Sequence, residues 1–455
     1  MTDLEGIAKK LIQKKTPENI IIERIIQEYA TFKDLPKQKL ALLASAILKE
    51  SKNSINSNND NPILRKILQF AKSNISMGEG GVGCRGRGDF FVHKLLTEIS
   101  ETSVHPYIPT SSLDDTGAVK WKNDTDQEPI IILSKMEGMH SRLSDFPFLA
   151  GFHVTRAALR DICVKGGIPI SIMVDVHLAD DGDIGKLFDF QAGIATVAEL
   201  AKVPITAGST LRIGGDMVIG DRLTAGIAGI GIGKYQFFRK NIQISDDILM
   251  IEGSGGGTIA TTALYSNNPQ YVLETINIKF LKASRLLLNS PDISSSIHSM
   301  NDITNGGLRG DLYEISKEAN CGFRIDLDSV KELVNPRILH LLESNNVDYL
   351  GVSLDSLMIF CDSKISSDII HLIEGNKIKI KRIGNVIEEK EIIFESNDSK
   401  KNVMPLFRES AYTEIKKAVD TQIMDETLIN SKIRDAFEKS VEKKEEIIEY
   451  IRNLE

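Results

Sequence analysis

The sequence has few cysteines, no long apolar run and no signal-like start. Its four cysteines, Cys84, Cys163, Cys321 and Cys361, lie far apart without a CxxC pair, so neither a zinc site nor a disulfide framework is indicated. A reducing cytoplasm is therefore the expected location. No run of apolar residues is long enough to span a bilayer, and residues 1–16 mix acids with lysines. We expect a soluble, unprocessed protein without membrane contact.

An excess of positive charge is missing as well. The chain carries 55 basic and 63 acidic residues, for a formal net charge of −8. Since nucleic acid is attracted by a basic field, this balance argues against nucleic acid as a partner. The 455 residues also exceed one ordinary core, and an average of about 150 residues per domain predicts two or three domains.

The pattern of apolar, polar and glycine residues divides the chain into four segments. Residues 1–76 show helical spacing, interrupted by an Asn/Ser-rich loop at 51–62, and are expected to form a helical extension. Residues 77–235 and 243–395 each alternate strand-like apolar runs with helical stretches, which predicts two α+β domains. Residues 396–455 are polar and then strongly charged with helical periodicity, which is typical of a solvated tail or a packing arm.

Carboxylates stand at strand ends and in a helix of the first α+β domain. Asp114 and Asp115 are adjacent at the end of a predicted strand, Glu137 closes the next strand, and Asp161 lies in a predicted helix. Oxygen ligands of this kind hold a divalent cation such as Mg²⁺. Two alternatives stay open, because Asp-Asp-Thr-Gly is also a common turn and Asp161 is spaced to pair with Lys165 one helical turn on.

Two glycine segments are candidates for binding an anion. Residues 77–89 contain six glycines and two arginines, so that backbone N–H groups can approach phosphate closely. Gly306 and Gly307 follow Asp302 and precede a predicted helix over 308–319, whose free N–H groups favour an anion. The alternatives are arginines that only solubilise the loop, and a tight turn in which Thr304 or Asn305 caps the helix.

The order and spacing of these motifs resemble a known superfamily. Its members include aminoimidazole ribonucleotide (AIR) synthetase, selenophosphate synthetase, thiamine monophosphate kinase and the hydrogenase maturation protein that dehydrates a thiocarboxamide. The residues that carry the resemblance are Leu113–Val119, similar to the paired-aspartate strand; Glu137–His140, similar to Glu-Gly-x-His; Asp161 with Gly166, Gly167 and Pro169, similar to the "Asn-Asp" helix; and Met300–Leu308, similar to Asp-Ile-Ser-Asp-Gly-Leu.

The resemblance implies a two-domain α+β, AIR synthase-like fold and a homodimer in which the first domains share a barrel. It also implies ATP and Mg²⁺ as cofactors, with an unidentified small molecule as the phosphoryl acceptor. The implied metal ligands are Asp114, Asp115, Glu137, Asp161 and Asp302. The implied nucleotide-binding residues are Gly81, Gly83, Arg85, Gly306 and Gly307, and Arg142 and Cys84 are the catalytic candidates.

Several residues depart from the family pattern. The metal-binding aspartate that usually precedes Glu-Gly-x-His is absent, since residues 133–136 read Leu-Ser-Lys-Met. In the selenophosphate branch a reactive Cys or selenocysteine precedes a lysine, whereas Cys84 precedes Arg85, so the loop is predicted to cradle phosphate. The terminal cysteine of the hydrogenase maturation branch is absent from residues 451–455. His140 is interpreted as a packed residue. A nucleotide-binding regulatory or scaffold protein is the alternative function.

Overall fold

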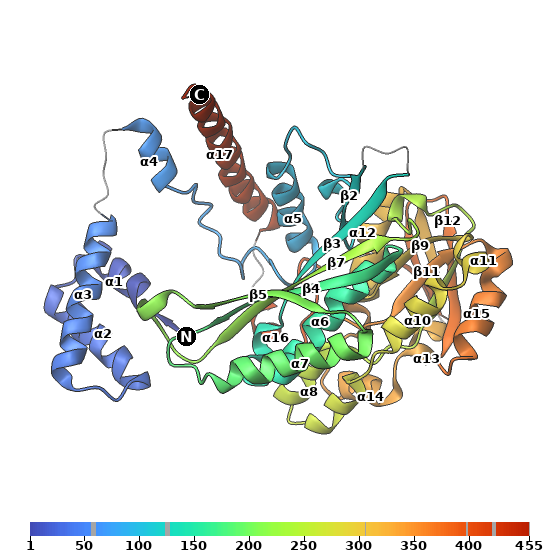
Figure 1. Ribbon diagram of the computed structural model, residues 1–455, viewed down its shortest axis with the longest axis horizontal. Helices are drawn as coiled ribbons and strands as arrows, with labels where there is room; N and C mark the ends of the chain where they lie inside the picture. The colour runs from blue at the N-terminus through green and yellow to red at the C-terminus, as the bar shows by residue number, and fades with distance from the viewer. Residues whose placement is uncertain (56–60, 123–127, 305, 397–398, 421–424, 455) are drawn as a thin grey trace.

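The computed structural model describes residues 1–55, 61–122, 128–304, 306–396, 399–420 and 425–454. Figure 1 shows a small group of helices at the N-terminus, set apart from a larger body that holds two sheets. The predicted α+β fold with helical extensions at both ends is confirmed. In the described part of the chain, no helix combines the length and the apolar character needed to cross a membrane.

The N-terminal helices have an apolar core of their own. Ile21, Ile25 and Tyr29 pack there with Leu40 and Ile47, at the spacing of one helix face. Helix α3 continues to Ile55, past the start of the expected loop, because Leu48 and Ser51 are buried; residues 56–60 lie outside the described residues. The elements are β1 (Thr2–Asp3), α1 (Leu4–Gln13), α2 (Glu18–Phe32), α3 (Lys37–Ile55) and α4 (Pro62–Leu68).

The first large unit is a five-stranded sheet in the order β2-β3-β7-β4-β5, with helices α6 and α7 on one face (Figure 1). The two helices pack closely because they meet at glycines: a Cβ on Gly151 would stand 2.1 Å from the Phe190 carbonyl oxygen. The elements are α5 (Arg87–Ile99), β2 (Gly117–Trp121), β3 (Ile130–Gly138), α6 (Pro147–Val164), β4 (Gly167–Leu178), α7 (Gly185–Ala201), β5 (Ile205–Arg212), β6 (Val218–Ile219) and β7 (Leu223–Gly233).

The opposite face of this sheet is apolar and has no covering layer among the described residues. Its side chains come from adjacent strands, because Ile132 pairs with Val119 on one side and with Ile232 on the other, and Ile232 pairs with Ile168. Large side chains on this face are 41 to 59% exposed, namely Val119, Trp121, Ile130, Met136, Ile168 and Ile170.

The second large unit is a seven-stranded sheet in the order β14-β13-β10-β12-β8-β11-β9. Strands β8 and β11 are buried along their whole length, because both faces of the sheet are covered. The strands are β8 (Asp247–Ile251), β9 (Ile297–Asp302), β10 (Gly322–Asp326), β11 (Leu357–Cys361), β12 (Ile380–Ile387), β13 (Ile392–Ser396) and β14 (Ser399–Asn402).

One apolar core joins the two units. Leu159 of α6 and Val174 of β4 belong to the same buried cluster as Leu249 of β8 and Ile359 of β11. The ends of β3, α6 and β9 therefore meet at the junction, where the predicted site residues lie. The helices of the second unit are α8 (Gly257–Tyr265), α9 (Val272–Thr275), α10 (Lys279–Leu288), α11 (Pro291–Ser294), α12 (Gly307–Ala319), α13 (Leu327–Leu333), α14 (Pro336–Ser344) and α15 (Ser366–Glu374).

The C-terminal part returns to the first unit. Residues 403–413, which we name the C-terminal strap, run along the glycine loop that precedes α5, and α16 (Glu414–Asp420) follows. Helix α17 (Glu426–Arg452) then packs beside α5, as Figure 1 shows. Its Ile429 is buried, while most of its other side chains are exposed or half-buried, so α17 is a packing arm.

Candidate functional site

A cavity of about 620 Å³ lies at the junction of the two units. Its walls come from the glycine loop, the segment before β2, the end of β3, helix α6, the start of α8, the end of β9, the C-terminal strap and α16. Elements from both units and from the C-terminal part therefore build one site. All five predicted metal ligands line this cavity: Asp114, Asp115, Glu137, Asp161 and Asp302.

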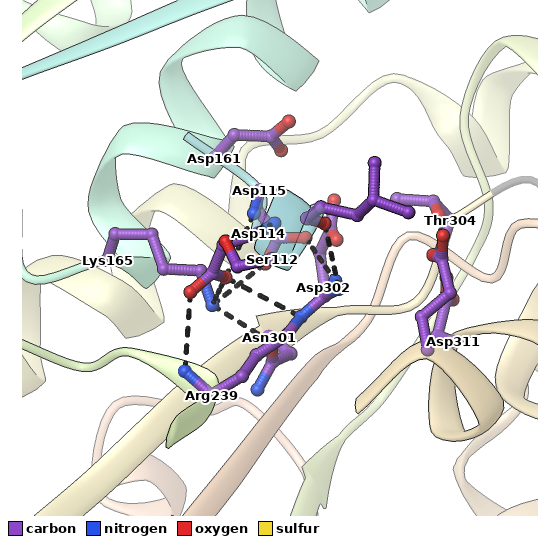
Figure 2. Close-up of polar contacts among 12 residues, drawn as sticks. Ser112, Asp114, Asp115, Asp161, Lys165, Arg239, Asn301, Asp302, Thr304 and Asp311 are labelled. Atoms are coloured by element: carbon purple, nitrogen blue, oxygen red, sulfur yellow. Dashed lines mark hydrogen bonds and ion pairs between the residues drawn. The ribbon is translucent and has the colours of Figure 1, made fainter. Parts of the chain in front are cut away.

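Asp114 and Asp115 face the same two cations. The Lys165 ammonium lies 2.7 Å from Asp114 Oδ1 and 3.0 Å from Asp115 Oδ2, and an Arg239 nitrogen lies 2.8 Å from Asp115 Oδ1 (Figure 2). Alternation along a strand would separate the two carboxylates, but the backbone turns just before them, at Leu113, whose φ is 50°. Burial raises the pKa of Asp115, yet the charges of Lys165 and Arg239 outweigh burial and hold that pKa well below its ordinary value.

The alternative pairing of Asp161 with Lys165 is wrong. Helix α6 ends at Val164, and the Lys165 ammonium turns to Asp114 and to the Met300 carbonyl oxygen, 2.8 Å away. Asp161 is nevertheless ion-paired, since its Oδ2 lies 2.7 Å from the Lys135 ammonium and its Oδ1 accepts from Arg160 Nε at 3.0 Å.

Lys135 and Glu137 reach the site because they share one face of β3. Residues two apart on a strand point the same way, and Leu133, two residues before Lys135, is buried on the face covered by α6. The Lys135 ammonium lies 3.3 Å from Glu137 Oε2 as well as 2.7 Å from Asp161. Burial lowers the pKa of Lys135, but the charges of Asp161 and Glu137 outweigh burial and raise it above its ordinary value.

Arg160 connects the first unit to the second. Its buried guanidinium contacts Asp302 at the end of β9 and lies 2.7 Å from Asp355 Oδ1. Asp355 also pairs with Arg156 at 2.5 Å. Burial raises the pKa of Asp302 well above its ordinary value, although the Arg160 charge acts in the opposite direction.

The two predicted glycine sites are shaped by close backbone contacts. Gly81 and Gly83 have positive φ, and a Cβ on Gly86 would stand 2.4 Å from the Leu406 carbonyl oxygen of the C-terminal strap. Gly83 and Arg85 line the cavity, and the Gly83 N–H donates to Asp89 Oδ1 at 2.8 Å. Cys84 lies between these two lining residues and is half-buried.

Arg85 is directed toward acidic side chains. One guanidinium nitrogen lies 2.9 Å from Glu314 and 3.8 Å from Asp311. At the second glycine site, Gly306 and Gly307 have positive φ at the start of α12, and a Cβ on Gly307 would stand 2.3 Å from the Leu350 carbonyl oxygen.

The alternative of Thr304 as helix cap is wrong, because Gly306 occupies the cap position. Thr304 instead donates through its backbone N–H and its hydroxyl to Asp311. Asn305 lies outside the described residues.

Two further cations and a neutral histidine line the cavity. The Arg142 guanidinium stacks over the Tyr265 ring and the Lys416 ammonium over the Tyr412 ring. No carboxylate of the described residues lies within ion-pair distance of either cation. The Tyr412 hydroxyl lies 3.2 Å from His140 Nε2. Burial, together with Lys416 and Arg142, lowers the pKa of His140 to about 4, so the ring is neutral at physiological pH.

Comparison with known proteins places the chain in a family. The model of the AIR synthase related protein N-terminal domain matches residues 113–233, and that of the C-terminal domain matches residues 246–396. An uncharacterized protein of Methanocaldococcus jannaschii, MJ1416, is 44% identical over 458 residues, which cover 99% of either chain. The chain belongs to the AIR synthase related protein family. The superfamily that the motifs indicated is thereby confirmed.

Solved structures support the fold of this AIR synthase related protein. A chain of the HypE–HypF complex aligns with a TM-score of 0.56 and 16% identity, over 70% of this chain and 99% of that one. The hydrogenase maturation protein HypE in complex with ATP aligns with a TM-score of 0.51 and 16% identity, over 72% of this chain and 96% of that one. At these identities the likeness concerns the fold.

The magnesium ion that the resemblance implies does not fit the site as it is arranged. Among the residues that the structure describes, no group of three or more His, Cys, Asp or Glu side chains is placed to hold a metal ion. Each of the five predicted ligands instead contacts a lysine or arginine. The metal assignment therefore stays a prediction, and no chemical step is derived from it.

Residues outside the motifs complete the site. Arg160 is adjacent to Asp161 in sequence, and Lys135 lies within residues 133–136, the segment from which the family aspartate is absent, so both stood close to signals in the sequence. Arg239 and Asp355 lie in segments without a motif. Tyr412 follows both family domains, and only its fold brings it to His140.

Proposed function

We propose that this AIR synthase related protein is an enzyme that binds ATP and uses it to phosphorylate or activate a small molecule. The observation that carries the proposal is the cavity at the junction of the two units, because six Lys and Arg side chains line it and its volume suits a ligand. The likeness to HypE in complex with ATP supports a nucleotide as the ligand.

The lining cations form two groups according to their partners. Lys135, Arg156 and Arg160 are paired with carboxylates, and this group is proposed to contact the polyphosphate. Arg142 and Lys416 lie over the rings of Tyr265 and Tyr412, and this group is proposed to contact the acceptor. Two cations without a carboxylate partner among the described residues suit an acceptor that itself carries an anionic group.

The proposed catalytic work is positioning and charge neutralisation. Fixed guanidinium and ammonium groups stabilise the negative charge that spreads over the transferred phosphoryl group, without forming a covalent intermediate. Arg142 is proposed to contact that group. His140, with a pKa of about 4, is a weak base at neutral pH, so its expected role is to accept a hydrogen bond.

The glycine loop is proposed to cradle phosphate oxygens through its backbone N–H groups. Gly83 and Arg85 line the cavity, and Cys84 lies between them. If the protein is an enzyme, the alternative reaction is a selenophosphate synthetase-like one at the Cys84 thiol.

The alternative without catalysis is a regulatory or scaffold protein that binds nucleotide without turnover. The lysine at position 135 supports this alternative.

The test is a titration of the full chain with ATP, followed by measurement of ADP, AMP and phosphate release with candidate acceptors. The expected result is saturable ATP binding and a nucleotide product that depends on the acceptor. Arg142→Gln is expected to lower turnover at least about tenfold with little change in ATP affinity, since its contact is with the transferred group. A chain that binds ATP without turnover supports the regulatory alternative, and a chain that does not bind ATP refutes the proposal.

A further inference from the structure

A lysine ammonium lies between two of the carboxylates that the family resemblance assigns to a metal ion. The Lys135 Nζ atom is 2.7 Å from Asp161 Oδ2 and 3.3 Å from Glu137 Oε2, and the side chain lines the cavity with 22% of its surface exposed. A divalent cation held by Glu137 and Asp161 would need the space that this ammonium fills. The sequence therefore supplies a covalently attached cation at this position.

The same arrangement recurs at the other predicted metal ligands. Lys165 lies within 3.0 Å of both Asp114 and Asp115, and its side chain is fully buried. The Arg160 guanidinium contacts Asp302 and Asp161 together. All five carboxylates are therefore neutralised by side chains of the protein itself.

The charge balance of the whole cavity agrees with neutralisation of the carboxylates by lysine and arginine side chains. Seven Asp and Glu side chains line it against six Lys and Arg side chains, and Lys165 and Arg239 reach the lining aspartates from behind. Asp311 and Glu314 hold Arg85 from outside the cavity wall. Negative and positive charges are close to balance without a metal ion, whereas a site for a hard divalent cation has an excess of carboxylate oxygen.

Displacing these cations is costly. A metal ion that entered between Glu137 and Asp161 would separate the half-buried Lys135 ammonium from both of its carboxylate partners, and a charge that loses its partners where water is largely excluded is destabilising. A polyphosphate, in contrast, is attracted by Lys135 and Arg160, whose carboxylate partners keep them oriented toward the cavity.

We propose that Lys135 and Arg160 are the fixed cations of this site, in the place of a divalent metal ion, and that the site binds the polyphosphate of a nucleotide without added metal. This inference rests on the proposed function and adds that nucleotide binding does not require a metal ion. The ligand class is a nucleoside triphosphate as the free anion, and Lys135 is the residue that distinguishes this site from a metal-dependent one.

The experiment is a calorimetric titration of the full chain with a non-hydrolysable ATP analogue, in EDTA and in excess Mg²⁺. We expect dissociation constants that agree within about threefold, since the fixed cations are present in both buffers. Mg²⁺ alone, added to the parent chain, is expected to leave its melting temperature unchanged, because each of the five predicted ligand carboxylates already contacts a lysine or arginine.

Substitutions at position 135 sharpen the test. Lys135→Gln is expected to weaken analogue binding in EDTA by at least about tenfold, because one charge-assisted contact is lost. Lys135→Asp places a third carboxylate beside Glu137 and Asp161, and its binding is expected to fail in EDTA and return with Mg²⁺. Lys202→Gln is the matched control, since the Lys202 side chain is 73% exposed and its ion-pair partner among the described residues is Glu199, which is also on the surface.

Two outcomes would contradict the inference in different ways. Parent binding that is lost in EDTA and restored by Mg²⁺, with Mg²⁺ alone raising the melting temperature, overturns the fixed-cation assignment and leaves the proposed function standing. Absence of binding in both buffers overturns the proposed function and the inference with it. Circular dichroism identifies a variant that does not fold, and in that case the parent titration decides by itself.

Discussion

At the scale of single residues, Cys84 distinguishes two hypotheses for the glycine loop: a cradle for phosphate and a site with a reactive thiol. Its backbone N–H donates to the Gly81 carbonyl oxygen at 3.2 Å, and its neighbours Gly83 and Arg85 line the cavity. If the loop cradles phosphate through backbone N–H groups, the thiol makes no required contact. We expect Cys84→Ser to keep turnover within about threefold of the parent, because serine preserves the backbone and the approximate size.

Steady-state kinetics with saturating ATP check this expectation, and Cys321→Ser, at a buried cysteine outside the cavity, is the control for a general effect of replacing a thiol. A Cys84→Ser chain that binds ATP and has no turnover would establish the reactive thiol instead.

A second residue-scale prediction concerns pH and Asp311. Burial raises the pKa of its carboxyl to about 7, with Glu314 acting in the same direction and with Arg85 and the hydrogen bonds from Thr304 opposing. In the unfolded chain this carboxyl has an ordinary pKa of about 3.9. Between these two values the folded chain binds one proton more than the unfolded chain, so the Asp311 contribution makes the free energy of unfolding decrease as the pH rises. Above pH 7 that contribution no longer changes.

Asp311→Asn removes this titration. We expect the free energy of unfolding of the parent to fall relative to that of the variant between about pH 5 and about pH 7.5, as measured by urea unfolding at both values. Other titrating groups act in both chains, and their contributions cancel in the comparison. Parallel pH profiles for parent and variant would contradict the raised pKa.

At the scale of elements, the glycine loop and the C-terminal strap hold each other. The N–H groups of Arg87 and Gly88 donate to the carbonyl oxygens of Leu406 and Phe407. Glu409 of the strap is bound by Arg309, with both guanidinium contacts below 2.9 Å. Tyr412 then reaches His140. The position of the loop that lines the cavity thus depends on residues more than 300 positions away.

Gly86→Ala tests this contact. A Cβ at position 86 would stand 2.4 Å from the Leu406 oxygen and 2.5 Å from the Phe407 oxygen, so the strap must move. We expect a loss of about 1 to 3 kcal/mol of unfolding free energy, as for overpacking in a core, together with weaker ATP binding. Gly78→Ala in the same loop is the control, since a Cβ there meets no atom within 4 Å. Equal stability of the two variants, by urea unfolding, would show that the strap does not restrain the loop.

Local periodicity predicted the elements well, and long-range pairing could not be predicted. The alternating helical stretches predicted within residues 77–235 include α6 (Pro147–Val164) and α7 (Gly185–Ala201), because apolar spacing within a segment fixes its type. The partners of the site carboxylates depend on the fold: the Lys135 ammonium reaches Asp161 across strand and helix, and Arg239 reaches Asp115 from 124 residues away. The only local pair that spacing suggested, Asp161 with Lys165, does not form.

At the scale of the whole molecule, we predict that a second copy of this chain packs on the uncovered face of the five-stranded sheet. The apolar side chains of β2, β3, β7 and β4 are adjacent through their strand pairing, and six large ones on β2, β3 and β4 remain 41 to 59% exposed. An apolar face of this extent is unusual on a monomer and typical of an interface. The homodimer that the family resemblance implies would cover it, and obligate interfaces of this kind bury more than roughly 2,000 Å².

Ile168 is the best position at which to test this dimer. It lies on this face, where it pairs with Ile232, and is 46% exposed, so that its replacement leaves the core of one chain intact. We expect the parent to sediment as a dimer at micromolar concentration and Ile168→Glu to sediment as a monomer, because two carboxylates per dimer would be buried without partners. Leu273→Glu is the matched control, since Leu273 is 75% exposed on α9 in the second unit and its variant should remain dimeric. A parent that sediments as a monomer, or an Ile168→Glu variant that dimerises like the parent, would assign the apolar face to a different partner.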